Sequence, residues 1–259
     1  MRNTLLLYGK EMLEMSRSYK LLWVPVVFIL LGVMQPVVMY YLPELLASSG
    51  DIPAELASTL AAPSAPEVMA QVLNQYNTIG VLLVVLAGMN LVAGERYSGT
   101  AALILVRKVS PAQFIVAKWL GHITLIAISY TLSYSAAWYY SRIMLGSLAW
   151  ETTLQAGAIY LCWMLLAASI VLLFSTVLKG GAAALASILL LVVLTMTHNL
   201  LPSWFSWSPA KLAADAMSLL GGTGTVNLAG PLLLTVLAVL LCIAGASYIM
   251  RNQVIQDQP

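Results

Sequence analysis

Six blocks of apolar residues, each about 20 long, divide this chain, and nearly all of its charged residues lie in the segments between them. About 61% of the 259 residues are apolar and about 8% are charged, whereas a soluble domain usually carries roughly a quarter charged residues. Each block is long enough to cross a hydrocarbon core as a helix, and barrel strands would instead be short and alternating. We therefore predict an all-α, polytopic membrane protein that forms a single transmembrane domain over 1–259. Its six transmembrane helices are expected near 21–42, 76–93, 119–141, 154–177, 182–201 and 228–249.

The basic residues are unevenly divided between the two sides of such a bundle. With six spans, both chain ends, segment 94–118 and the turn near Lys179 share one side, which holds ten of the twelve Lys and Arg residues. Only Arg142 and Lys211 fall on the other side. Because loops rich in Lys and Arg remain in the cytoplasm, we predict that both termini are cytoplasmic and that the chain lies in the cell membrane. This asymmetry is an orientation signal, and we expect no nucleic-acid partner.

Three further segments flank the spans. Residues 1–20 interleave apolar side chains with Arg and Lys, which predicts an amphipathic interfacial helix in contact with membrane lipid. Residues 43–75 contain four prolines, so we expect an external loop without a single long helix. Residues 202–228 form a second external segment, in which Trp204 and Trp207 suit the membrane–water boundary.

The predicted cytoplasmic segment 94–118 carries the most informative pattern. Its notable residues, in chain order, are Glu95, Arg96, Gly99, Thr100, Leu103, Arg107, Lys108 and Pro111. Thr100 is placed to cap a short amphipathic helix over 101–106, and the two basic residues after that helix suit its dipole. Glu95 stands where the second span ends, and we expect it to form an exposed ion pair with Arg96 or another nearby cation, worth only about 0–1 kcal/mol. Pro111 then begins the segment that leads into the third span.

This pattern resembles the cytoplasmic loop of type-2 ABC exporter permeases. There E-R-x-x-G-T is followed by a leucine-bearing stretch, a proline and a lysine that enters the next span, as in Glu95–Thr100, Leu103, Leu105, Pro111 and Lys118 here. The order of the predicted segments along most of the chain also agrees with that of this family. Residues 107–110 depart from the pattern, because many relatives have a threonine-proline turn there. The resemblance implies a coupling helix that docks on a separate ABC-type ATP-binding subunit, and short re-entrant helices within 202–228.

Several other classes of protein are disfavoured. The chain contains no G-x-x-x-x-G-K-[ST] sequence, so we predict that it is not itself an ATPase and binds no cofactor; ATP and Mg would bind through the partner subunit. Cys162 and Cys242 lie inside predicted spans without ligand-spaced partners, which predicts neither a disulfide nor a metal site. No span carries a clear central charge, which disfavours an ion-coupled carrier.

The sequence is thus interpreted as the membrane-spanning permease subunit of an ABC exporter. The resemblance and the small number of spans favour a homodimer, or a pseudo-dimer with a related permease. Asn90, Ser133 and Thr195 are candidates for lining the pathway, although such residues also hydrogen-bond neighbouring helices. The alternative is a membrane scaffold or receptor-like subunit that transports nothing. The cargo is open among lipid-linked molecules, amphiphilic drugs, antimicrobial peptides and polysaccharides.

Overall fold

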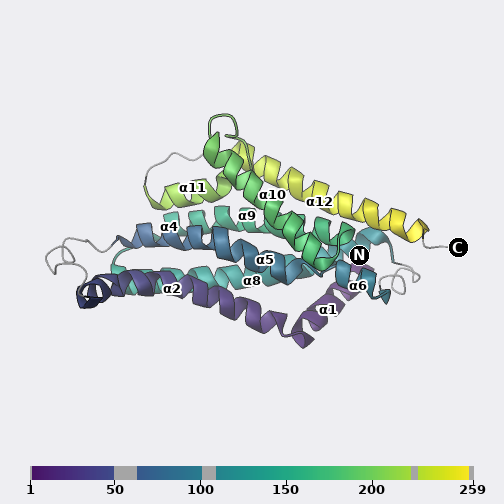
Figure 1. Ribbon diagram of the computed structural model, residues 1–259, viewed down its shortest axis with the longest axis horizontal. Helices are drawn as coiled ribbons and strands as arrows, with labels where there is room; N and C mark the ends of the chain where they lie inside the picture. Colours follow the sequence, from purple (N-terminus) through teal and green to yellow (C-terminus); the bar gives the residue numbers. More distant parts are fainter. Residues whose placement is uncertain (1, 50–62, 101–108, 223–226, 257–259) are drawn as a thin grey trace.

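The computed structural model describes residues 2–49, 63–100, 109–222 and 227–256, and every regular element in these ranges is helical (Figure 1). The elements are α1 (Arg2–Arg17), α2 (Lys20–Ser49), α4 (Ala65–Gln75), η1 (Tyr76–Gly80), α5 (Val81–Gly88), α6 (Ala93–Tyr97), α8 (Pro111–Leu145), α9 (Trp150–Val177), α10 (Gly180–Leu200), α11 (Lys211–Leu220) and α12 (Ala229–Gln256). Within the described ranges, six helical stretches are long and apolar enough to cross a membrane. They are Lys20–Leu45, Ala65–Tyr97, Pro111–Leu145, Trp150–Val177, Gly180–Leu200 and Ala229–Asn252. The prediction of an all-α protein with six spans is confirmed.

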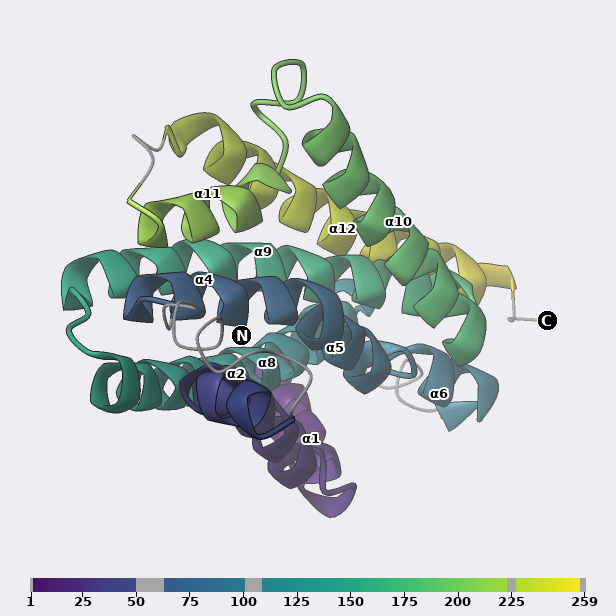
Figure 2. The ribbon, with the colours of Figure 1, turned by 60° about the vertical axis from the view of Figure 1, so that its left-hand side comes forward.

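The fourth span, α9, is the central helix of the bundle. It contacts α5, α8, α10, α11 and α12, and Figure 2 shows it between the α8 layer and the α10–α12 layer. Its side chains Tyr160 and Trp163 are fully buried and form part of the main hydrophobic core. By contrast, α10 and α12 keep many apolar side chains exposed. Such surfaces are expected of helices that face lipid or another chain.

The second span is made of several consecutive helical pieces. It begins with α4, passes through the π-helical turn η1, continues as α5 and ends with α6. A π-helical turn inserts an extra residue into an α-helix and often marks a functional position. Gly88, at the end of α5, permits a close approach, because a Cβ there would lie 2.6 Å from Nε2 of His122.

The loop between the first two spans is shorter than the sequence predicts. Helix α2 continues through Pro43 to Ser49, and the second span begins as early as Ala65. Proline is tolerated in this helix because neighbouring groups in a membrane bundle can satisfy the freed backbone carbonyl. The start of α4 is fixed by Ser64, whose backbone N–H donates to Oε2 of Glu67 at 3.0 Å. The intervening residues lie outside the described ranges.

Two short helices lie at opposite ends of the bundle (Figure 1). At one end, called here the α6 end, the chain turns at Tyr19, which has a φ of 57°. This turn between α1 and α2 allows α1 to pack against α2 and α8. At the other, called the α11 end, α11 packs on α4 and α9 through Leu212, Ala216 and Leu220. The sequence analysis predicted a helix within residues 1–20 and short helices within 202–228, and α1 and α11 lie in these two segments. Two statements about these helices stay predictions: that α1 lies among the lipid headgroups, and that α11 is re-entrant.

Candidate functional site

A cluster of charged side chains, three buried and one half-buried, joins three helices at the α6 end. It consists of Lys10, Glu11, Glu95 and Lys118 and is called here the charge cluster. Nζ of Lys118 lies 3.0 Å from Oε2 of Glu11 and 3.0 Å from Oε1 of Glu95, and the lysine side chain is only 1% exposed. Lys10 also forms an ion pair with Glu95. The cluster therefore connects α1, α6 and α8.

The start of α8 sets the position of Lys118. Pro111 is the first residue of the helix, as predicted, and Ser110 is its N-cap. Oγ of Ser110 accepts from the backbone N–H of Gln113 at 3.2 Å, and the Gln113 side chain accepts from the N–H of Ser110 at 3.1 Å. This reciprocal capping fixes the first turn. Lys118 follows about two turns later, with its ammonium 5.1 Å from the centroid of the Phe114 ring.

The end of the second span is fastened to α9. Oγ of Ser175 accepts from the backbone N–H groups of Val92 and Ala93, at 3.0 Å and 3.1 Å, where the chain passes from α5 to α6. The guanidinium of Arg96 donates to carbonyl oxygens at the last residues of α9. The two members of the Glu95–Arg96 pair in the motif thus reach different helices.

The expectation of an exposed Glu95 is wrong. The residue is only 8% exposed, and its carboxylate forms ion pairs with Lys10 and Lys118 rather than with its neighbour Arg96. The reason is that α1 folds over this end of the bundle and covers the carboxylate. A buried ion pair is much more costly to break than an exposed one, so the small energy assigned from the sequence does not apply.

Gly99 and Thr100 close a turn on Glu95. Gly99 has a φ of +76°, a conformation that glycine adopts without the steric penalty other residues meet. The hydroxyl groups of Ser98 and Thr100 both donate to the backbone carbonyl of Glu95, at 3.2 Å and 3.3 Å. The E-R-x-x-G-T pattern therefore builds one hydrogen-bonded turn at the end of the span. Leu103, Arg107, Lys108 and the predicted helix over 101–106 lie outside the described residues.

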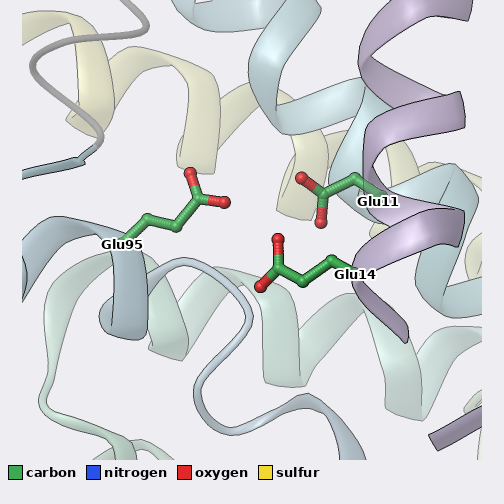
Figure 3. A group of neighbouring side chains, drawn as sticks. All are labelled: Glu11, Glu14 and Glu95. Atoms are coloured by element: carbon green, nitrogen blue, oxygen red, sulfur yellow. The ribbon is translucent and has the colours of Figure 1, made fainter. Parts of the chain in front are cut away.

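Three carboxylates meet beside this turn. Figure 3 shows Glu11 and Glu14 of α1 pointing toward Glu95, and their carboxylate oxygens lie within 4.8 Å of one another. Lys10 and Lys118 supply positive charge to these carboxylates, as a metal ion otherwise would. Nζ of Lys10 also lies 3.4 Å from Oε2 of Glu14. Partial burial by itself lowers the pKa of Lys10, but the hydrogen bond to Glu95 and the surrounding carboxylates outweigh it and raise that pKa. We interpret the cluster as an ion-pair network rather than a metal site.

The three predicted pathway residues lie in different places. Asn90 is exposed near the α6 end, beside a cavity of about 480 Å³ that Lys20 and Glu95 also line. Ser133 is fully buried inside the bundle, where its hydroxyl is hydrogen-bonded to the hydroxyl of Tyr76 and the carbonyl of Phe28. The structure therefore does not bring these two residues together.

Thr195 lies on a surface cavity between the second, fourth and fifth spans. The cavity has a volume of about 360 Å³, and Asn77, Thr78 and Trp163 also line it. The Thr195 hydroxyl donates to the carbonyl of Leu191 at 2.9 Å, within its own helix, and the indole N–H of Trp163 donates to Asn77 at 3.1 Å. Polar groups thus face a mostly apolar cavity at the π-helical turn of the second span.

Sequence reasoning did not assign site roles to Lys10, Glu11 or Asn77. Lys118 was named only as the lysine of the family motif. It is an isolated charge within an apolar run, which indicates a buried partner of opposite charge. Glu11 gave no comparable signal, because a carboxylate among the basic residues of an amphipathic helix is ordinary. Its role depends on the fold of α1 against α8.

Comparison with known proteins agrees with this architecture. A sequence model of the ABC-2 family of transporter proteins matches residues 5–207, which include the charge cluster and five of the six candidate spans. Over 221 residues the chain is 32% identical to YxlG, an uncharacterized transmembrane protein of Bacillus subtilis (strain 168), and the alignment covers 85% of this chain and 86% of that protein. The chain therefore belongs to the ABC-2 family of transporter proteins and is a multi-pass membrane protein of the permease-subunit type, not the ATPase subunit.

Proposed function

We propose that this permease exports its substrate from the cytoplasm, driven by ATP that a separate ABC-type ATP-binding subunit hydrolyses. In this proposal both termini and the α6 end face the cytoplasm, where ATP and Mg bind to the partner subunit. The observation that carries the proposal is the charge cluster, which fixes the Glu95–Thr100 turn to the N-terminal helix α1 and to the third span. Family membership supports the need for an ATP-binding partner.

The contacts of the turn explain how motion would spread from the partner into the bundle. Glu95 connects it to α1 and α8, and Arg96 and Ser175 connect it to α9. A displacement of the turn would therefore move several helices together as a rigid body, which is a common form of conformational switching. We propose that the coupling residues are Glu95, Arg96, Gly99, Thr100, Leu103, Arg107, Lys108 and Pro111.

We further propose that two permease chains, identical or related, assemble with two ATP-binding subunits. The exposed apolar side chains of α10, together with the 360 Å³ cavity lined by Thr78 and Thr195, suit a surface that faces the second permease. Polar groups at membrane depth are tolerated where they are partnered or wet, which makes Thr195 a better pathway candidate than the fully bonded Ser133. Asn90 would lie at the cytoplasmic entrance.

The test is co-purification from the native membrane. The tagged chain, extracted in mild detergent, is expected to retain a P-loop ATP-binding subunit in equal amount and to hydrolyse MgATP. A matched pair of variants assigns the contact: Arg96→Gln should reduce the retained ATP-binding subunit, whereas Arg251→Gln on α12 should not. A chain that is isolated alone, without ATP hydrolysis above the detergent background, would support the scaffold function instead.

A further inference from the structure

A separate cavity lies at the α11 end, between the end of α8 and the start of α9. Its volume is about 370 Å³, within the range of roughly 300–1,000 Å³ that is usual for small-molecule sites. The residues that line it are Tyr134, Ser135, Trp138, Tyr139, Trp150, Thr153 and Leu154. Four of these seven are aromatic, so the walls suit a hydrocarbon chain. Tyr and Trp also favour the level at which lipid tails meet their headgroups.

The indole of Trp138 has an unsatisfied hydrogen-bond donor. Its Nε1 atom is buried and has no hydrogen-bond partner among the described residues. Two other indoles in the bundle are satisfied, since Trp119 donates to Ser169 at 2.8 Å and Trp163 donates to Asn77 at 3.1 Å. A buried N–H without an acceptor costs free energy, and buried tryptophans usually find a partner. A ligand in the cavity that carries an acceptor would remove this cost once the indole, which lines the cavity, turns its N–H toward that acceptor.

A cation lies beside the same indole. The guanidinium carbon of Arg142, one turn further along α8, lies 5.6 Å from the centroid of the Trp138 ring. Arg142 is exposed and forms no ion pair with any side chain in the described ranges. Guanidinium groups bind phosphate through paired hydrogen bonds. The apolar wall of the cavity, the N–H donor of Trp138 and the cation of Arg142 thus lie in the same order as the acyl chain, the ester carbonyl and the phosphate of a phospholipid.

We propose that this cavity binds one resident membrane phospholipid. An acyl chain lies among the aromatic side chains, an ester carbonyl accepts from Nε1 of Trp138, and the phosphate binds Arg142. The site lies at the opposite end of the bundle from the charge cluster, and it holds a structural lipid rather than transported cargo. The proposal therefore stands independently of the proposed transport function.

Native mass spectrometry of the full-length chain in detergent tests the site. The probes are dioleoylphosphatidylglycerol, dioleoylglycerol, which lacks the phosphate, and inorganic phosphate, which lacks the chains. We expect one phospholipid per chain to be retained more strongly than any further adduct. Dioleoylglycerol should bind weakly, and inorganic phosphate should not displace the phospholipid.

Variants with matched controls identify the residues. Arg142→Gln should weaken phospholipid retention about tenfold, because a charged hydrogen-bonding partner is lost, and Arg142→Lys should be intermediate. Arg251→Gln is the control, since Arg251 lies 5.4 Å from the Tyr248 ring in a similar arrangement on α12. Trp138→Phe, which keeps an aromatic ring but removes the N–H, should weaken retention about fivefold.

Trp204→Phe controls for a general loss of tryptophan, because Trp204 is 78% exposed and does not line the cavity. Equal retention by Arg142→Gln and Arg251→Gln would overturn the phosphate assignment, as would equal binding of dioleoylglycerol and dioleoylphosphatidylglycerol. Equal retention by Trp138→Phe and wild type would overturn the role of the indole. Size-exclusion profiles identical to wild type show that the variants are folded.

Discussion

Nζ of Lys118 lies 3.0 Å from Oε1 of Glu95, so a cation inside the third span holds the last turn of the second span. The same amine lies 3.0 Å from Glu11 of the N-terminal helix. One lysine thereby joins segments that are 23 and 107 residues away in the chain. Because charges are costly to bury without partners, the three side chains stabilise one another only when α1, α6 and α8 are correctly docked.

Lys118→Met is expected to destabilise the bundle strongly. It leaves Glu11 and Glu95 buried without their shared cation, and breaking a buried ion pair in this way costs about 3–5 kcal/mol. Thermal unfolding in detergent should show a Tm several degrees below wild type. The double variant Glu11→Gln with Lys118→Met should recover part of the loss, because one uncompensated charge is removed. Lys179→Met, an exposed control at the same end, should leave the Tm nearly unchanged.

Ser133 and Thr195 should respond differently to loss of the hydroxyl group. Ser133→Ala leaves the buried hydroxyl of Tyr76 without its partner, which costs about 1–3 kcal/mol. Thr195→Val keeps its shape and loses only a bond to its own helix, so its Tm should match wild type. Thermal unfolding of the two variants measures the difference. Similar Tm values for both would contradict the structural role assigned to Ser133.

The six spans were predictable because a continuous apolar block of sufficient length has few alternatives to a membrane helix. The residues at which the helices begin and end were harder to predict. Pro43 reads as a helix breaker in water, yet in this bundle α2 continues beyond it to Ser49. The motif from Glu95 to Thr100 was also recognisable, since its glycine and hydroxyl residues build a local turn.

The partners of Glu95 were not predictable from the sequence. Lys10 reaches it only because the chain reverses at Tyr19 and lays α1 across α8. Lys118 reaches it from α8, which belongs to a different span. Such a reversal leaves no local pattern in the sequence, since a non-glycine residue with positive φ is uncommon at any position. The same limit applies to Ser133, where a polar residue in a span predicts a partner without saying which one.

Lys10 should give the cluster a dependence on alkaline pH. Its pKa is raised in the folded protein from the ordinary value of 10.5, so its stabilising effect is fully present below that value. The effect is lost as the pH rises through the higher folded-state pKa. The Tm of Lys10→Gln should therefore lie below that of wild type at pH 7 to 9, and the gap should close at higher pH. A gap that widens with rising pH would contradict this sign.

Cysteine labelling tests the orientation. In a background where Cys162 and Cys242 are replaced by alanine, an impermeant maleimide should label Ser206→Cys in intact cells. It should label Lys179→Cys only after lysis, because the distribution of basic residues places that turn in the cytoplasm. Both positions are exposed in the structure, so access is limited by the membrane alone. The opposite labelling pattern would invert the bundle and the proposed direction of transport.

Gly99 provides the sharpest test of coupling, and Gly146 is its matched control. Both have positive φ, +76° and +109°, and no atom of the described residues lies within 4 Å of a Cβ placed at either site, so a valine there strains the backbone without a clash among those residues. Each substitution should cost at least about 1–2 kcal/mol, because a side chain at Cβ disfavours these conformations. Gly146 lies at the α11 end, away from the turn that closes on Glu95. Only Gly99→Val should therefore affect the link to the ATP-binding subunit.

The measurement uses a fluorescent label on Ser206→Cys at the far end of the bundle, in the complex with its ATP-binding subunit. MgATP should change the fluorescence of wild type and of Gly146→Val. In Gly99→Val the change should be largely lost while ATP hydrolysis continues, because a strained turn no longer transmits the motion of the partner. Gly99→Asn should keep most of the response, since asparagine tolerates positive φ better than valine does. Equal responses from Gly99→Val and Gly146→Val would exclude the turn from coupling and favour transmission through another contact.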